Sequence, residues 1–239
     1  MKKIGLALVF IPLISSCTYT SNNMVNNSWF ADADKYTVGS FSISFENISK
    51  IEINWIAGSL KIQKSEDGKI SGSENGTDLL PDESLRYYVN EGTLLIQFCQ
   101  SLYNKPIDFK KKQANVFLPD GLRWDMNSVS SSFSSDDGIV CTKAAFDSVS
   151  GDVDVSNLDC PEVKLDTVSG SVDLGLTPSM KDISVSTVSG DVDLGLNSQT
   201  MAVSFSTVSG SFSSECEYSM TNGKYVFGND ECEAEVDTV

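Results

Sequence analysis

The sequence predicts an all-β fold: a parallel β-solenoid in which each turn of the chain, or rung, takes about 20 residues and contains two short strands. Four copies of Val-Ser-Gly begin at Val149, Val168, Val188 and Val208, at spacings of 19, 20 and 20 residues. Such a fixed period is typical of solenoids. Around each copy, apolar residues alternate with polar ones, which is the periodicity of a strand with one buried face. No apolar stripe of helical period competes with this interpretation.

The repeat divides into columns, each made of the residues at one position in successive rungs. The apolar columns are expected to point inward and to stack about 4.8 Å apart. They are Trp124, Ala144, Val163, Ile183 and Val203; Met126, Phe146, Leu165, Val185 and Phe205; and Phe133, Val153, Val172, Val192 and Phe212. Alternate residues point inward, and which of the two alternating sets does so switches across each Val-Ser-Gly, which we call the corner. We expect the glycine at the corner to adopt a positive φ. A hydroxyl column lies beside the corner: Ser128, Ser148, Thr167, Thr187 and Thr207.

Outside the tandem copies, Ile51–Ile62 has the same rhythm and is interpreted as a first rung. An insertion at about 63–121 separates it from the others. Within the insertion, segments 86–89 and 93–98 are expected to form a hairpin, and 114–118 another strand. The basic segment 109–112 is interpreted as a solvated loop. At the other end, 235–239 matches half a rung, which either caps the stack or ends it early.

The N-terminus is typical of an exported lipoprotein. Two lysines precede an apolar run, Ile4–Ile14, that is too short to span a bilayer. The run ends in Leu13-Ile14-Ser15-Ser16-Cys17, which resembles the lipobox of bacterial lipoproteins. That resemblance implies cleavage before Cys17 and its acylation, with palmitate as one acyl chain. The alternative is an ordinary secretory signal with an incidental cysteine. We therefore expect a signal peptide at 1–16, an acylated tether at 17–35 and a single domain at 36–239.

The composition argues against nucleic-acid binding and against catalysis. The formal charge of −16 argues against nucleic acid as a partner, because a phosphate backbone would repel the chain. The sequence contains no histidine, which removes the commonest general base and the commonest zinc ligand. No phosphate loop or dinucleotide fingerprint occurs. We therefore expect no enzyme.

The rung at Ile56–Ile62, the strand Val116–Pro119 and the copies from Val149 together resemble the bacterial family named for its putative adhesin domain, whose function is unknown. Members carry tandem Thr-Val-Ser-Gly-Asp-Val copies. The resemblance spans about 36–239 and implies a β-solenoid with an adhesin-like role. This chain departs from the pattern at Ser131, where the other copies have glycine.

Two sets of residues are candidate sites. Stacked aspartates could bind calcium, the one cofactor considered, although a solvated acidic face is the simpler interpretation. They are Asp152, Asp154, Asp173, Asp191 and Asp193. Cys141 and Cys160 occupy equivalent places in adjacent rungs and could form a disulfide, as could Cys216 and Cys232. Cys99 would then be the odd cysteine.

The expected function is that of a non-enzymatic, lipid-anchored surface module of the bacterial cell envelope, located in the outer membrane and facing the periplasm or the exterior. Its partners are the membrane, through the N-terminal lipid, and an envelope protein, a glycan or a host surface. An accessory of envelope-stress or signalling systems is the alternative. A carboxylate-based glycan hydrolase is a remote one, because nothing in the regular spacing distinguishes an acid from a base.

Overall fold

The structure is a computed structural model, and it describes residues 32–76, 79–100, 112–135, 138–177, 179–196, 201–207, 214, 217–227 and 233–238. Apart from one 3-10 turn at Ala33–Lys35, every regular element among them is a β-strand. The all-β prediction is confirmed. The strands are β1 (Thr37–Val38), β2 (Phe41–Ser44), β3 (Lys50–Lys64), β4 (Lys69–Asn75), β5 (Arg86–Asn90), β6 (Thr93–Gln97), β7 (Gln113–Leu118), β8 (Leu122–Ser135), β9 (Cys141–Ser148), β10 (Val153–Leu158), β11 (Glu162–Thr167), β12 (Val172–Leu176), β13 (Asp182–Thr187), β14 (Val192–Leu196), β15 (Met201–Thr207), β16 (Ser219–Thr221), β17 (Lys224–Phe227) and β18 (Glu233–Thr238).

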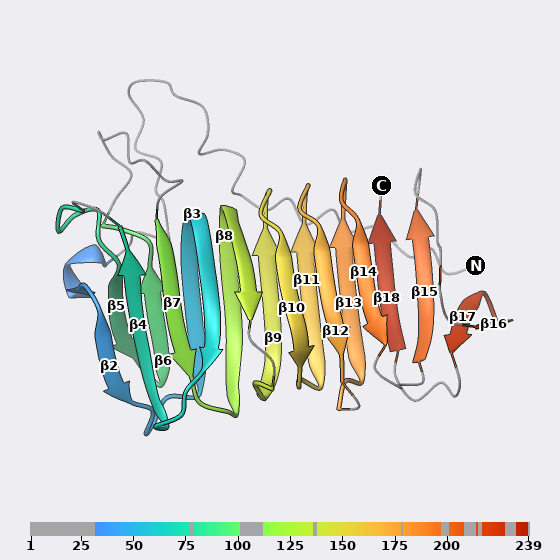
Figure 1. Cartoon of the computed structure of the whole chain (residues 1–239), viewed down its shortest axis with the longest axis horizontal. Helices are drawn as coiled ribbons and strands as arrows, with labels where there is room; N and C mark the ends of the chain where they lie inside the picture. Colours follow the sequence, from blue (N-terminus) through green and yellow to red (C-terminus); the bar gives the residue numbers. More distant parts are fainter. Residues whose placement is uncertain are drawn as a thin grey trace, which may run out of the picture.

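The strands form two layers that share a core. Figure 1 shows the strands of these layers lying side by side along the long axis of the molecule. In the first layer the order is β6, β3, β8, β9, β11, β13, β18 and β15, all parallel. In the second it is β7, β3, β8, β10, β12 and β14, also parallel. The long strands β3 and β8 pass through the corner and belong to both layers. The three rungs that follow are each split into two strands, β9 with β10, β11 with β12 and β13 with β14, as the sequence predicts.

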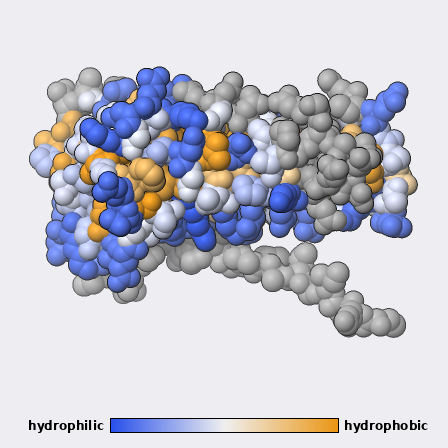
Figure 2. Space-filling model, turned by 90° about the horizontal axis from the view of Figure 1, so that it is seen from below, coloured by the Kyte–Doolittle hydropathy of each residue, from blue (hydrophilic) through white to orange (hydrophobic). Residues whose placement is uncertain are grey.

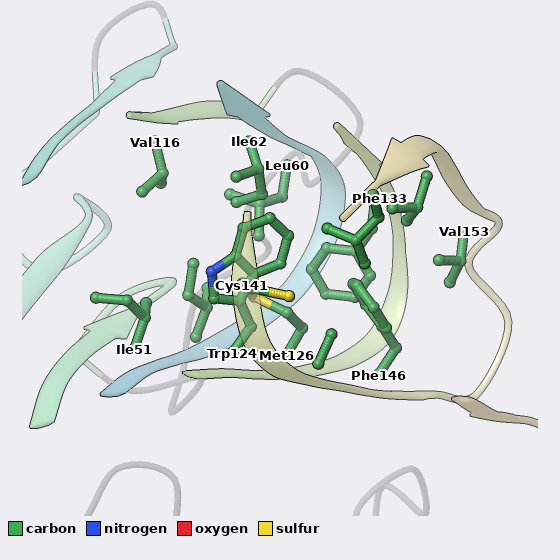
Figure 3. Close-up of a cluster of buried hydrophobic side chains, with 14 of the residues drawn as sticks. Ile51, Leu60, Ile62, Val116, Trp124, Met126, Phe133, Cys141, Phe146 and Val153 are labelled. Carbon is green, nitrogen blue, oxygen red and sulfur yellow. The ribbon is translucent and has the colours of Figure 1, made fainter. Parts of the chain in front are cut away.

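The strand registers confirm the apolar columns. Trp124, Ala144, Val163 and Ile183 are consecutive partners, and each is at most 1% exposed. In the second layer Phe133, Val153, Val172 and Val192 follow one another in the same way, although Val192 is only partly buried. Figure 3 shows Trp124, Phe133 and Val153 in one cluster of buried side chains. Each large apolar side chain removed from water stabilises the fold by about 1.5–3 kcal/mol. Phe212 lies outside the described residues.

Glycine stands at the corner for a different reason from the predicted one. Gly151, Gly170 and Gly190 are absent from the residues with positive φ, although Gly58 in the first rung has a φ of 89°. Instead, the glycines of successive rungs touch. A Cβ on Gly151 would lie 1.7 Å from the carbonyl oxygen of Ser131, and a Cβ on Gly190 would lie 2.2 Å from that of Gly170. The absence of a side chain lets consecutive corners approach closely.

Four members of the hydroxyl column, Ser128, Ser148, Thr167 and Thr187, are buried, and three of them form hydrogen bonds that hold their corners together. The backbone N–H of Gly151 donates to the Ser148 hydroxyl oxygen at 3.0 Å, and that of Gly170 donates to Thr167 Oγ1 at 3.1 Å. Ser128 accepts from the backbone N–H of Ser131 in the same way, at 2.9 Å. At these three corners a short hydroxyl side chain therefore satisfies a buried donor that the bend would leave unpaired, whereas Thr187 Oγ1 forms no such hydrogen bond.

The predicted insertion contains a rung of its own. The hairpin between β5 and β6 is confirmed, and its turn residues Glu91 and Gly92 both have positive φ. However, β6 also pairs in parallel with the first half of β3, and β7 with its second half. Together β6 and β7 form a split rung that precedes β3 in space. The antiparallel strands β4 and β5 lie on this rung, and β2 and β1 lie on them in turn. The N-terminal end of the solenoid is thus covered by antiparallel strands.

At the C-terminal end the expected order of rungs is wrong. The half-rung containing Val236 neither caps the stack nor falls short of it, because β18 lies between β13 and β15 in parallel with both. Val185, Val236 and Phe205 occupy one column, so β18 fits between two rungs that the period alone would make neighbours. The hairpin of β16 and β17 then pairs antiparallel with β15.

Candidate binding faces

The outer surface of the first layer carries acids and bases in alternation, and we call it the mixed-charge face. It includes Lys50, Glu52, Asp125, Lys143, Glu162, Lys164 and Asp166. Lys50 Nζ lies 2.6 Å from an Asp125 carboxylate oxygen and 3.1 Å from one of Glu52. Lys143 pairs with Glu162, and Lys164 with Asp166. Exposed pairs of this kind contribute little stability individually, but they neutralise the face.

One column of this face is partly buried and holds amides and acids. Asn127 Nδ2 donates to Asn54 Oδ1 at 3.0 Å, and the next two members of the column are Asp147 and Asp166. Burial raises the pKa of the Asp147 carboxyl, and the neighbouring negative charge of Asp166 raises it further. A hydrogen bond between the two carboxyl groups favours a shared proton. This column is a pH-sensitive part of the face, which sequence reasoning missed because the burial of Asp147 and its contact with Asp166 depend on side-chain packing.

The outer surface of the second layer carries the predicted aspartate columns, and we call it the acidic face. Asp154, Asp173 and Asp193 are consecutive partners on β10, β12 and β14, as expected. These three, together with Asp152 and Asp191, are exposed. Residues 152–158, 171–176 and 191–196 contain no Lys or Arg, so this part of the surface is uniformly acidic. Figure 2 shows hydrophilic residues on both sides of an apolar band in the middle of the molecule.

The aspartates do not gather around one point. Asp152 is partly engaged in structure, because its carboxylate accepts a hydrogen bond from the backbone N–H of Ser171 at 3.0 Å. Within the described ranges, no group of three or more Asp, Glu, Cys or His side chains could hold a metal ion. The ladder geometry presents the carboxylates of Asp154, Asp173 and Asp193 in a line.

The predicted cysteine pair meets inside the core. Cys141 and Cys160 are both free and buried, and the Cys141 thiol forms a hydrogen bond with Cys160. That hydrogen bond and burial raise the pKa of Cys141 well above its ordinary value. Cys99 is also buried, in the segment that follows β6. Cys17, Cys216 and Cys232 lie outside the described residues.

A buried lysine lies at the corner of the split rung. Lys112, expected in a solvated loop, is 1% exposed, which corrects that interpretation. Its ammonium group is 2.9 Å from Glu74 Oε2, donates to the carbonyls of Glu83 and Phe98, and faces the rings of Trp55 and Phe98 at 5.1 and 4.1 Å. Desolvation lowers the pKa of Lys112, and the charge of Glu74 opposes that effect. Lys112 thus satisfies two backbone carbonyls inside the core, and no sequence signal separates it from its basic neighbours.

In the part of the chain that the structure describes, there is no helix with the length and apolar character needed to cross a bilayer.

Comparison with known proteins finds one matching family and several similar solved structures. Residues 125–238 match the model of the family described as Toastrack DUF4097, which confirms the resemblance drawn from the Val-Ser-Gly copies. No curated protein matches the chain. A putative cell adhesion protein from Clostridium sporogenes is 14% identical, with 85% of this chain and 94% of that one covered and a TM-score of 0.46. A putative adhesin from Bacteroides fragilis is 14% identical, with 85% and 97% covered and a TM-score of 0.43. A putative lipid binding protein from Parabacteroides distasonis is 12% identical, with 84% and 96% covered and a TM-score of 0.36.

Proposed function

We propose that this chain, which carries the Toastrack DUF4097 match over residues 125–238, is a non-enzymatic binding module held at the bacterial cell envelope by a lipid on Cys17. The lipobox supports the anchor, and the absence of histidine from the sequence supports a role without acid–base catalysis. The polar segment after Cys17 would serve as a tether that holds the solenoid away from the membrane.

The acidic face is the observation that carries the proposed binding role. Five exposed aspartates lie on three stacked rungs without a basic residue among them. Carboxylates about 5 Å apart repel one another, and a partner with clustered positive charge relieves that repulsion on binding. On the mixed-charge face, Asp125, Glu162 and Asp166 already have cations beside them, so a cationic partner would relieve less repulsion there. The partner of best fit is therefore an envelope or surface protein with a basic patch.

Affinity purification from detergent-solubilised envelopes tests this assignment. The wild type is compared with a variant carrying Asp154→Asn, Asp173→Asn and Asp193→Asn. The matched control carries Asp182→Asn, Glu235→Gln and Asp237→Asn, which removes the same number of exposed acids from the first layer. We expect the acidic-face variant to lose the partner by tenfold or more at low salt, and the control to retain it. Equal recovery by all three proteins, or no partner with any of them, would contradict the proposal.

The anchor has a separate test. Cells expressing the wild type or Cys17→Ala are labelled with palmitate, and the chain is isolated from membrane and soluble fractions. The label is expected on the wild type in membranes and on no form of the variant, because Cys17 is the acylated residue of the lipobox. Label on Cys17→Ala, or its absence from the wild type, would exclude this anchor.

A further inference from the structure

Cys141 and Cys160 occupy one inward position on neighbouring rungs. Val140 and Asp159, the residues just before them, are parallel bridge partners, and the backbone N–H of Cys141 donates to the carbonyl of Asp159 at 2.9 Å. Cys141 is 2% exposed and Cys160 is fully buried. Figure 3 shows Cys141 inside the cluster that contains Trp124 and Met126.

The geometry of adjacent parallel strands suits a disulfide between these residues. Partner positions on neighbouring strands are about 4.8 Å apart, which is within the 4.4–6.8 Å that disulfides span between Cα atoms. The two side chains point the same way, and their thiols are already in hydrogen-bond contact.

We infer that Cys141 and Cys160 are joined by a disulfide that cross-links two rungs inside the core of the mature protein. Each thiol loses a proton, one Sγ–Sγ bond forms, and the two electrons pass to a disulfide acceptor, which is reduced to two thiols. The acceptor is a disulfide-exchange protein of the exported compartment or a small disulfide such as oxidised glutathione. Because both sulfurs are buried, exchange takes place while the rungs assemble.

The cross-link lies at an irregular place in the stack. The corner spacing from Val149 to Val168 is 19 residues, one fewer than in the next two rungs. The register between β10 and β12 shifts between Val155 and Leu158, and that between β8 and β9 shifts after Leu122. A covalent bond between Cys141 and Cys160 closes this shorter rung and limits its opening, since it removes conformations from the unfolded chain.

Peptide mapping of the full-length protein tests the inference. Protein from envelopes is unfolded in denaturant that contains N-ethylmaleimide, so that buried free thiols are blocked at once, and is then digested with trypsin without reduction. Cleavage after Arg123, Lys143 and Lys164 places Cys141 on peptide 124–143 and Cys160 on 144–164, with no other cysteine on either. We expect the two peptides as one species, two hydrogens lighter than their sum. Separate peptides that both carry N-ethylmaleimide, or either cysteine linked to a different one, would overturn the inference.

A stability measurement gives an independent readout. Reductant is expected to lower the melting temperature of the wild type by about 5–10 °C. It should leave the Cys141→Ala/Cys160→Ala variant unchanged, whereas Cys99→Ala should respond as the wild type does. An equal response of the wild type and the double variant would count against the cross-link. Free thiols in chains that carry the Cys17 lipid would exclude the disulfide while leaving the proposed anchor intact.

Discussion

The carbonyl oxygen of Gly151 faces Gly170 of the next rung so closely that a Cβ on Gly170 would lie 2.1 Å from it. Real Cβ atoms do not approach a backbone oxygen to this distance, and the oxygen belongs to a rung that is hydrogen-bonded on both sides. The corner glycines therefore set how tightly the solenoid stacks.

Gly170→Ala should lower the free energy of unfolding by about 3 kcal/mol or more, because the rung must shift to admit one methyl group. Gly195→Ala is the matched control, since its Cβ would meet Gly175 Cα at 3.7 Å, an ordinary contact. Urea unfolding followed by far-ultraviolet circular dichroism gives both values. Similar midpoints for the two variants would show that the corners can separate freely.

Thr167→Val removes the hydroxyl that accepts from the backbone N–H of Gly170 but keeps the volume of the side chain. An unsatisfied buried donor costs about 1–3 kcal/mol. Thr167→Ser should restore the stability almost fully, because Ser148 performs the same role one rung earlier. If Val and Ser variants unfold at the same urea concentration, the corner hydrogen bond is not a stabilising element.

Lys112→Met should cost about 3–5 kcal/mol, because it leaves the carboxylate of Glu74 buried without its cation. Glu74→Gln in the same chain keeps an acceptor for the backbone N–H of Leu85, which donates to Glu74 Oε1. The double variant should therefore be more stable than the sum of the single losses predicts. A double-mutant cycle from chemical unfolding measures this coupling, and additive losses would show that the ion pair is not formed.

Asp147→Asn should stabilise the protein at neutral pH. The pKa of Asp147 is raised in the folded state, so the folded chain binds more protons than the unfolded one between the ordinary value of 3.8 and the raised value. Stability contributed by the protonated form is thus lost as pH rises through the folded pKa. The amide avoids this loss and extends the Asn54–Asn127 pair. Asp125→Asn, which breaks a contact with Lys50, should act in the opposite direction. Melting curves from pH 3 to pH 7 test both, and an advantage of Asp147→Asn that grows at low pH would contradict the explanation.

Calcium is expected to leave the melting temperature unchanged relative to a chelator at equal ionic strength, because the carboxylates of the acidic face stand in a line. Asp173→Asn should raise stability slightly, and less so in high salt, since Asp173 lies between Asp154 and Asp193. A calcium-dependent increase that Asp173→Asn abolishes would instead establish a metal site.

The repeat predicted the register of the fold but not the order of its rungs. The alternation of Ile183, Val185 and their equivalents specifies which residues share a column, and the pairings agree. Any segment with that pattern fits beside any other, so the pattern could not show that Val236 lies between Val185 and Phe205. The pattern also did not show that Ile96 and Val116 belong to one rung. Their strands β6 and β7 are separated by 15 residues, which breaks the period of the repeat.

The candidate site was predictable to a similar degree. The aspartate line and the cysteine pair followed from spacing, because both depend on register alone. The burial of Lys112 and the contact between Asp147 and Asp166 did not, because they depend on which neighbours fill the space around a side chain.

The position of β18 has a consequence for how the chain folds. β15 precedes β18 in the sequence, and the edge of β13 carries the same columns as β18. A folding chain can therefore pair β15 directly with β13, as the repeat period favours. That pairing must open again before β18 can enter, so the final stage of folding competes with a near-native misassembly.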